Sequence, residues 1–544
     1  MRKLALALLV VELACWSDTM PSNPAVDAIF QKFQKPGSPG CALSVIRDGR
    51  IEYKRAYGMA DLDHDVPLTT TSVFHVASVS KQFTAAAIVL LALDGKLSLD
   101  DPVRKYIPQL PGFGVPITLR HLIHHTSGLR DQWSLLGLAG WRYSLDLITD
   151  NDVLDVMSRQ NDLNFPPGDK HLYCNTGYTL LAQVVKRVSG QSFREFTSKR
   201  IFEPLGMKNT HFRDDHAEIV KNIALGYEPR KDTFALSVTN FDTVGATSLL
   251  TTVEDLALWD QNFYAPRVGG PALLKQILER GRLNSGKELD YAFGLVHGKY
   301  KGLTTVDHGG ADAGYRADLL RFPEQHFSVV CLCNLSTASP GELARKVADV
   351  FLAGLLKEDT PKAKTESAEM IVTPEQIGKV AGLYWRRDGD GFRKFVVESG
   401  TLKLVFPGES YELKALAPDR FRIVAFPQEF RFQGTRVADG EITPDTVWFE
   451  AVQPWAPTPA DLKVFAGAYT SSELDAIWRI DLKDGKLMLK RLKSKPESLE
   501  PMLRDVFAGN TGAFRFKWGK DGRVSGFVLN AGRVRNVRFE RQAP

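Results

Sequence analysis

Residues 75–91 read His75-Val76-Ala77-Ser78-Val79-Ser80-Lys81-Gln82-Phe83-Thr84-Ala85-Ala86-Ala87-Ile88-Val89-Leu90-Leu91. The alanines and branched residues of the second half predict a buried helix that runs to Leu93 and stops at Gly95. Ser78 lies where this helix begins, and Lys81 lies one turn further on. A spacing of three places both side chains on the same face of the helix.

This Ser-x-x-Lys pair has the chemistry of an activated nucleophile. A serine hydroxyl attacks poorly until a neighbouring base takes its proton. Lys81 would be that base if burial lowered its pKa, because desolvation disfavours the ammonium form. The unpaired N–H groups at the start of the helix would stabilise negative charge that develops there. Because Ser-x-x-Lys is a common sequence by chance, the hypothesis needs further residues.

The length and charge of the chain narrow the classes of protein to which it can belong. With 544 residues it is too long for one ordinary core, and roughly two to four domains are expected. The composition, 44% hydrophobic and 24% charged, is that of a folded soluble protein. A formal net charge of +5 is small for this length and predicts no dedicated nucleic-acid surface.

Residues 1–22 read as a signal peptide, which predicts export to the periplasm or secretion. Arg2 and Lys3 precede an unbroken apolar segment at 4–11. A short packed or disordered N-terminus is the alternative. Lipidation at Cys15 is only weakly indicated, because the usual leucine three residues before the cysteine is missing. No later segment reaches the roughly eighteen apolar residues of a membrane span.

The cysteines after Cys15 are scattered along the chain. Cys331 and Cys333 alternate with Leu332 in an apolar segment, so both should face one side of a sheet. Together with Cys41 and Cys174, they are expected to be small buried hydrophobic residues and not a disulfide framework or a zinc site.

The pattern over residues 23–358 predicts an α+β domain. Arg47-Asp48-Gly49-Arg50 is a hairpin signal, helical periodicity dominates 144–213, and an amphipathic helix is expected at 342–357. Strands are expected at 41–46, 51–58, 302–307, 317–322 and 327–334. Strands from both ends thus enclose a helical middle, which indicates a mainly antiparallel sheet.

A charged linker at 359–372 leads into two repeated units, 373–455 and 456–544. Thr373-Pro374 recurs 85 residues later as Thr458-Pro459, and three further segments recur in the same order. Each unit begins with a short helical turn and continues with about eight short strands, the pattern of a small closed antiparallel barrel.

Two further segments supply what a Ser-Lys pair needs. Tyr173-Cys174-Asn175 precedes a helix predicted over 176–188, and a Tyr173 phenol beside a cationic Lys81 would act as a base and then as an acid. A predicted strand ends at His308, and the glycines of Gly309-Gly310-Ala311 would let a substrate backbone lie against its edge. Taken alone, Tyr173 and His308 would each be assigned to packing.

Together, Ser78-x-x-Lys81, Tyr173-x-Asn175 and His308-x-Gly310 resemble the three ordered motifs of the penicillin-recognising serine hydrolases. This family includes class C β-lactamases, D-aminopeptidase, D,D-carboxypeptidases and related esterases. The resemblance covers about residues 24–357 and implies the β-lactamase/transpeptidase-like fold. It extends to supporting stretches at 120–129, 165–168, 204–207 and 314–316.

The resemblance implies a role for each matching residue. Ser78 would be the acylated nucleophile, and Lys81 would accept its proton. Tyr173 would carry protons to the leaving group, and Asn175 would hydrogen-bond the substrate amide.

The third motif completes the implied site. His308 would stand where the family has a lysine, followed by Gly309 and Gly310, and the N–H groups of Ser78 and Ala311 would form the oxyanion hole. The family uses no metal or organic cofactor. Burial is favoured over zinc binding for three other histidines, since no His-Glu-x-x-His frame contains them: His121, His124 and His125.

Departures from the family pattern bear on the substrate. A histidine at position 308 is mostly neutral at pH 7 and should attract a substrate carboxylate less than a lysine would. This favours peptidase, amidase or esterase activity over β-lactamase activity. The stretch Gly245-Ala246-Thr247-Ser248 is less glycine-rich than the family's form, which leaves that wall of the pocket undefined.

A catalytic domain followed by two barrels resembles D-aminopeptidase, in which barrel loops limit the active-site cleft. A loop within 494–512 is therefore expected to close the pocket, with an unassigned acidic residue neutralising a substrate ammonium. Alternatively, the barrels bind lipid or sugar, or act as spacers.

The leading hypothesis is an exported hydrolase of small amides or peptides; the alternatives are an esterase, a β-lactamase, or an acylated sensor or binding protein. The oligomeric state stays open, with a homodimer as one alternative.

Overall fold

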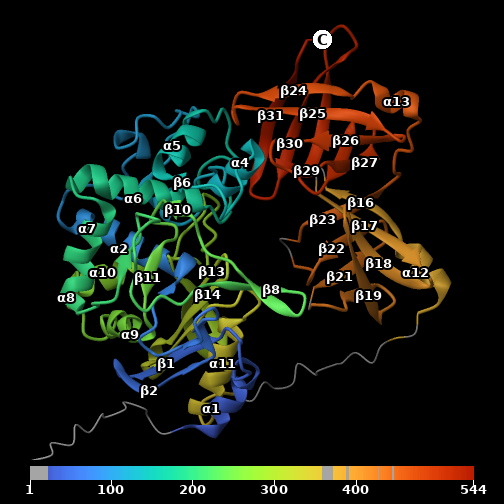
Figure 1. Cartoon of the computed structure of the whole chain (residues 1–544). Helices are drawn as coiled ribbons and strands as arrows, with labels where there is room; N and C mark the ends of the chain where they lie inside the picture. Colours follow the sequence, from blue (N-terminus) through green and yellow to red (C-terminus); the bar gives the residue numbers. More distant parts are fainter. Residues whose placement is uncertain are drawn as a thin grey trace, which may run out of the picture.

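The computed structural model describes residues 22–357, 370, 372–386, 391–426, 428–443 and 446–543. The predicted signal peptide through residue 21, Cys15 and all of the predicted linker except residues 370 and 372 lie outside these residues. Figure 1 shows an N-terminal part with a sheet and many helices, followed by two β-barrels. Among the described residues, no helix is both long and apolar enough to cross a membrane.

A six-stranded antiparallel sheet, in the order β12-β13-β14-β15-β1-β2, carries the N-terminal part. Its strands are β1 (Cys41–Arg47), β2 (Arg50–Tyr57), β12 (Val296–Tyr300), β13 (Leu303–Asp312), β14 (Tyr315–Phe322) and β15 (Phe327–Cys333). Because β1 and β2 pair beside the last strands, the predicted enclosure of a helical middle by strands from both ends is confirmed. The α+β fold class is confirmed with it.

Helices cover both faces of the sheet. α1 (Pro24–Ile29) and α11 (Pro340–Phe351) pack on one face, while α2 (Ser80–Leu93) and α9 (Val253–Gln261) share the hydrophobic core of the other. The remaining helices of this part are α3 (Leu119–Ile123), α4 (Gln132–Ala139), α5 (Asp150–Ser158), α6 (Asn175–Ser189), α7 (Phe193–Thr197), α8 (Glu203–Leu205) and α10 (Gly270–Ile277).

Short strands join the helices to one another. They pair as β3 (Met59–Asp61) with β4 (Val66–Pro67), β8 (Tyr227–Arg230) with β9 (Thr233–Leu236), β6 (Ile148–Thr149) with β10 (Phe241–Asp242), and β5 (Phe74–His75) and β7 (His211–Phe212) with β11 (Leu249–Thr251). β5 lies immediately before Ser78 in the chain, and its pairing with β11 fixes the entry into α2.

The first barrel is closed and has eight strands. It begins with α12 (Pro374–Val380), which Thr373 caps together with Gln376. Its strands are β16 (Gly382–Arg386), β17 (Gly391–Glu398), β18 (Thr401–Phe406), β19 (Glu409–Ala417), β20 (Arg420–Ile423), β21 (Glu429–Gln433), β22 (Arg436–Asp439) and β23 (Trp448–Val452).

The second barrel repeats this plan, with α13 (Pro459–Lys463) capped by Thr458 and Asp461. Its strands are β24 (Gly467–Ser471), β25 (Ala476–Lys483), β26 (Lys486–Lys490), β27 (Glu497–Leu503), β28 (Val506–Gly509), β29 (Gly512–Trp518), β30 (Val524–Ala531) and β31 (Val534–Arg541). The two closed barrels predicted from the internal repeat are thus confirmed. In Figure 1 the second barrel lies beside α4 and α5, at the helical end of the N-terminal part.

The cysteine prediction is wrong in one respect, because Cys41 and Cys333 form a disulfide. They are direct partners in the β1–β15 pairing, which the sequence could not show across a separation of 292 residues. Cys331 and Cys333 do face the same side of the sheet, with their sulfurs 3.8 Å apart. Cys174 and Cys331 are buried free thiols, as expected.

Removing the disulfide should destabilise the N-terminal part. Loss of a native disulfide that closes a long loop typically lowers the free energy of unfolding by about 2–5 kcal/mol. We therefore expect Cys41→Ala/Cys333→Ala to unfold at a lower temperature than wild type in scanning calorimetry. A reducing agent should lower the Tm of wild type and of the control Cys331→Ala, but not that of the double variant. A reductant-sensitive double variant would contradict the pairing.

Candidate active site

A cavity of about 670 Å³ lies where β13 passes the start of α2. Seven of the eight residues that the sequence singled out line it, and Lys81 is fully buried behind Ser78. The seven are Ser78, Tyr173, Asn175, His308, Gly309, Gly310 and Ala311. The structure therefore brings together all of the predicted residues from three separate segments of the chain.

Ser78 sits in a short 3-10 turn, Ala77–Val79, which leads directly into α2. Ala77 has a φ of 48°, a left-handed conformation that is rare for a residue with a side chain. Such strain persists where the surrounding structure holds it, and it is concentrated at functional sites. The turn leaves Ser78 half-buried at the cavity wall, while Lys81 points inward from the first turn of the helix.

The Lys81 amine has three polar neighbours. Nζ lies 3.1 Å from Ser78 Oγ, 2.9 Å from Asn175 Oδ1 and 2.7 Å from the carbonyl oxygen of Ala246. The last two groups can only accept hydrogen bonds, whereas a hydroxyl can also donate one. An uncharged amine has two N–H donors and one lone pair, so it satisfies all three neighbours if the Ser78 hydroxyl donates.

Burial lowers the pKa of Lys81 to about 7. The buried carboxyls of Asp131 and Asp312 act in the opposite direction, and the Arg533 guanidinium lowers the pKa further. A substantial fraction of Lys81 is therefore uncharged at neutral pH, as a proton acceptor for Ser78 must be.

The ring of Tyr173 packs against the ring of His125. The two rings lie 4.2 Å apart, and His125 Nδ1 accepts a hydrogen bond from the Cys174 N–H. The buried Tyr173 hydroxyl faces Ser78 without a regular hydrogen bond to the described residues. Burial raises the pKa of Tyr173 above its usual value of 10.0, so the phenol is neutral at pH 7.

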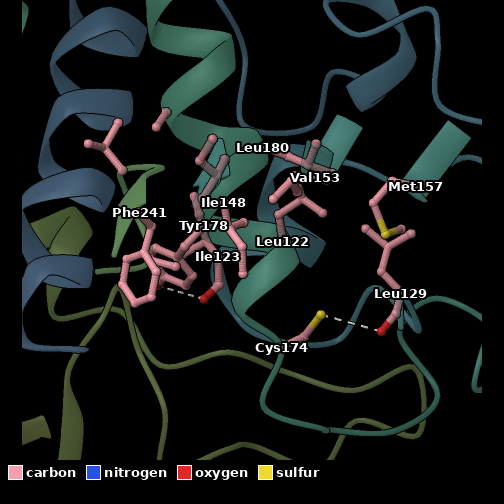
Figure 2. Close-up of a cluster of buried hydrophobic side chains, with 14 of the residues drawn as sticks. Leu122, Ile123, Leu129, Ile148, Val153, Met157, Cys174, Tyr178, Leu180 and Phe241 are labelled. Carbon is pink, nitrogen blue, oxygen red and sulfur yellow. Dashed lines mark hydrogen bonds between the residues drawn. The ribbon is translucent and has the colours of Figure 1, made fainter. Parts of the chain in front are cut away.

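The segment that carries Tyr173 and Asn175 is fixed by a hydrophobic cluster. Figure 2 shows Cys174, whose Sγ lies 3.4 Å from the Leu129 carbonyl oxygen, and Tyr178, whose hydroxyl donates to the Ile123 carbonyl oxygen at 2.9 Å. Both residues belong to the buried core between α3, α5 and α6. Packing of the residues that follow Tyr173 thus helps to set the direction in which its phenol points.

Asn175 begins α6 and connects Lys81 to a buried acid. Its backbone N–H and its side-chain amide both donate to Asp131 Oδ2, each at 2.9 Å, while its Oδ1 receives Lys81. Asp131 in turn caps α4 by accepting from the N–H groups of Trp133 and Ser134. The orientation of the Asn175 amide is therefore determined by its partners on both sides.

His308 is a buried neutral imidazole. Its Nδ1 lies 2.7 Å from the Gly309 carbonyl oxygen, which requires a proton on that nitrogen, and its Nε2 lies 3.2 Å from the Tyr291 hydroxyl. Burial, with a contribution from Lys81, lowers the pKa of His308 to about 4. The absence of charge at this position agrees with the expectation from the sequence.

The edge of β13 is open along the cavity. β12 pairs with β13 only as far as Asp307, so residues 308–312 have β14 as their neighbour on one side alone among the described strands. At Gly310 a Cβ would come within 2.2 Å of the Val76 carbonyl oxygen. A glycine is required here because the strand packs directly against the turn that carries Ser78. The sequence had suggested a different reason, namely room for a substrate backbone.

Two carboxyl groups that sequence reasoning missed also line the cavity. Asp312 accepts hydrogen bonds from the hydroxyls of Thr247 and Tyr143, and burial raises its pKa to about 7. Asp318 has one oxygen without a partner among the described residues, and burial raises its pKa to about 8. Asp312 follows the third motif directly, which was the one signal available in the sequence.

The prediction that a loop within residues 494–512 closes the pocket is wrong. Residues 494–512 include β27 and β28, and Met502, Val506 and Ala508 pack against the first barrel. The second barrel reaches the cavity instead through the turn between β30 and β31, which carries Arg533. The expected acidic residue is thus a basic one, and the acids of the cavity come from the sheet.

A buried ion pair fixes the second barrel to the N-terminal part. Arg130 Nη1 lies 2.6 Å from Glu473 Oε1, and both side chains are essentially inaccessible to solvent. Arg130 also donates to Gln160 and to the Asn536 carbonyl oxygen, while Glu473 accepts from the Arg538 N–H. Since Arg130 precedes Asp131, this contact lies directly behind the network that holds Asn175 and Lys81.

Two groups of potential metal ligands occur among the described residues, away from this cavity. One is Cys41, Cys331 and Cys333, in which the disulfide occupies two of the sulfurs; the other is the largely exposed set Asp215, His216 and Asp242. His124 and His125 are buried, as expected, whereas His121 is only partly buried.

Comparison with known proteins gives consistent results. The sequence model of the family described as Beta-lactamase matches residues 26–352. A penicillin-binding protein of Bacillus subtilis (strain 168) is 30% identical over 402 residues, which cover 71% of this chain and 88% of that protein. A D-aminopeptidase of Cereibacter sphaeroides (strain KD131) is 28% identical over 471 residues, which cover 85% and 84%. The octameric penicillin-binding protein homologue from Pyrococcus abyssi has a TM-score of 0.56 and 25% identity, with 78% of this chain and 99% of that chain covered.

Breaking the buried Arg130–Glu473 pair should cost far more than breaking an exposed one at the same interface. Glu473→Ala leaves Arg130 buried without its counter-charge, so we expect the free energy of unfolding to fall by about 3–5 kcal/mol in urea titrations. The control Lys493→Ala removes an exposed pair with Asp146, 3.4 Å apart, and should change the free energy of unfolding far less. Equal effects of the two variants would contradict the assignment.

Proposed function

Because the chain belongs to the beta-lactamase family, we propose that it is a serine hydrolase that cleaves small amides or peptides through an acyl-enzyme. The observation that carries this proposal is a buried Lys81 amine with a pKa near 7, within hydrogen-bonding distance of Ser78 at the wall of a cavity. Relatives named D-aminopeptidase support a substrate with a D-residue on the acyl side.

In the acylation step, Ser78 Oγ attacks the amide carbon and its proton passes to Lys81 Nζ. The carbonyl oxygen becomes an oxyanion, which the N–H groups of Ser78 and Ala311 would stabilise at the cavity wall. The C–N bond then breaks, and the departing nitrogen takes a proton that Tyr173 gives up and recovers from Lys81. The products are a free amine and an ester on Ser78.

Water completes the cycle by attacking this ester. One of its protons passes through Tyr173 and Lys81 back to Ser78 Oγ as the ester bond breaks, so the enzyme is restored and a carboxylic acid leaves. The raised pKa of Tyr173 fits a proton donor and relay better than a resting phenolate base. This arrangement makes Lys81 the base of the acylation step.

The open edge of β13 and Asn175 would position the substrate. An extended peptide can add its backbone to residues 308–311 as a further strand, with Asn175 donating to the acyl-side carbonyl. The neutral His308 lacks the permanent charge that suits the carboxylate of a β-lactam. At the third motif, this favours amide or peptide hydrolysis over β-lactamase activity, and recognition of a substrate carboxylate would have to come from another residue of the cavity.

Four chromogenic substrates test the proposal: D-Ala and L-Ala p-nitroanilides, p-nitrophenyl acetate and a cephalosporin. We expect D-selective release of p-nitroaniline by wild type and a loss of at least about a thousandfold in Ser78→Ala. Ester cleavage without anilide cleavage would favour an esterase, and rapid cephalosporin cleavage a β-lactamase. A stable acyl adduct on Ser78 without turnover, seen by mass spectrometry, would favour a sensor.

The pH dependence of acylation tests the role of Lys81. Only the uncharged amine accepts the Ser78 proton, so kcat/KM should fall about tenfold per pH unit below a pKa near 7 and level off above it. Asp312→Asn should show the same fall in kcat/KM toward acid pH, but with its midpoint at a lower pH, because Asp312 raises the pKa of Lys81. A profile that is flat between pH 5 and 8 would contradict the assignment.

Export of the protein is predicted from the sequence alone, and its oligomeric state stays open. Cleavage within or after residues 1–22 would be shown by the N-terminus of the protein recovered from the periplasm or medium of an expressing bacterium. The oligomeric state, for which a homodimer is one alternative, can be measured by light scattering coupled to gel filtration.

A further inference from the structure

We propose that Arg533 of the second barrel binds a carboxylate of the substrate and thereby sets the specificity of the site. The proposal rests on the function proposed above, and it adds a chemical class: amides or peptides with a free carboxylate close to the scissile bond. Among the described residues that line the cavity, Arg533 is the only lysine or arginine.

The turn that carries Arg533 has a fixed shape. Ala531 pairs with Val534, so Gly532 and Arg533 form a two-residue hairpin loop, and Gly532 has a φ of 54°. A glycine with positive φ at the first position is typical of a tight hairpin turn whose twist matches its strands. The turn is also anchored to the N-terminal part, because Asn164 Nδ2 donates to the Arg533 carbonyl oxygen at 2.9 Å.

The guanidinium group retains donors for a ligand. It lies 5.0 Å from the centre of the Tyr173 ring, and its Nη1 is 3.7 Å from Asp131 Oδ2, which is too long for a hydrogen bond. That Asp131 oxygen already accepts two hydrogen bonds from Asn175. The Arg533 side chain remains 45% exposed, so its planar fork can turn toward a carboxylate and bind it through two parallel hydrogen bonds.

The other ionisable groups of the cavity leave this role to Arg533. Lys81 is fully buried and bonded inward, and His308 is neutral. Both oxygens of Asp312 already accept from hydroxyl groups, and burial favours the protonated form of Asp318. A substrate anion entering the cavity therefore meets one exposed, permanently charged partner, placed beside Tyr173 and Asn175 on the reacting side.

Arg533 also lowers the pKa of Lys81, and this effect alone would change the rate of every substrate equally. Carboxylate binding would change only the substrates that carry the group. The two roles are thus separated by a ratio of kcat/KM values between matched substrates.

Two matched pairs of substrates measure this ratio and locate the carboxylate. D-Ala-Gly and D-Ala-glycinamide differ in a carboxylate on the leaving group, while D-Asp and D-Asn p-nitroanilides differ in one on the acyl group. We expect wild type to prefer the carboxylate member of one pair by roughly ten- to a hundredfold, the range for a hydrogen bond to a charged group. Arg533→Gln should abolish the preference, and Arg533→Lys should keep part of it.

Arg535→Gln is the matched control, since this arginine lies two residues further on, in β31, and lines other cavities. It should keep the wild-type ratio. The proposal is overturned if wild type shows no preference in either pair, or if Arg533→Gln lowers both members of a pair equally.

Binding to inactive protein separates failure of this inference from failure of the proposed function. In calorimetry, Ser78→Ala should bind the carboxylate member of the preferred pair more tightly than the neutral one, and Ser78→Ala/Arg533→Gln should not. This preference does not depend on turnover. Equal binding of both members to Ser78→Ala would contradict the role of Arg533 even in a functional hydrolase.

Discussion

The burial of one amine group governs the organisation of this site. Lys81 is excluded from solvent at the first turn of a helix whose next two turns are apolar, and an ammonium ion in that position loses most of its hydration. Nζ is surrounded by two groups that can only accept hydrogen bonds, Asn175 Oδ1 and the Ala246 carbonyl oxygen, and by the Ser78 hydroxyl. These three neighbours suit the neutral amine. The same desolvation that disfavours the charge makes the group a base toward Ser78.

The second barrel contributes to the site through its contacts with the N-terminal part and through one residue that lines the cavity. The buried Arg130–Glu473 pair fixes its position, Asn164 holds the tip of the β30–β31 hairpin, and that tip places Arg533 in the cavity. Because the barrel is closed, β30 and β31, the two strands of this hairpin, are each paired with a strand on both sides. A spacer would not require a fully buried ion pair at the interface, since such a pair is costly to desolvate.

Much of the fold could be predicted because its signals are local. The apolar helix after Ser78, the hairpin before residue 50 and the repeat of Thr373-Pro374 as Thr458-Pro459 each depend on neighbouring residues. Spatial pairing was harder to predict. The Cys41–Cys333 disulfide depends on which strands become neighbours, and the entry of Arg533 depends on how a distant barrel docks. The motif residues of the site were found in advance, whereas its electrostatic partners Asp131, Asp312 and Arg533 carry no motif of their own.

Titration of Lys81 tests most directly whether a substantial fraction of this amine is uncharged at neutral pH. The Cε and Hε signals of Lys81 in protein labelled with 13C-lysine, assigned by comparison with Lys81→Met, can be followed by NMR from pH 5 to 11. The account predicts a midpoint at about 7. A midpoint close to 10.5, the ordinary value for lysine, would show that the amine stays charged, and Lys81 could not then be the base that activates Ser78.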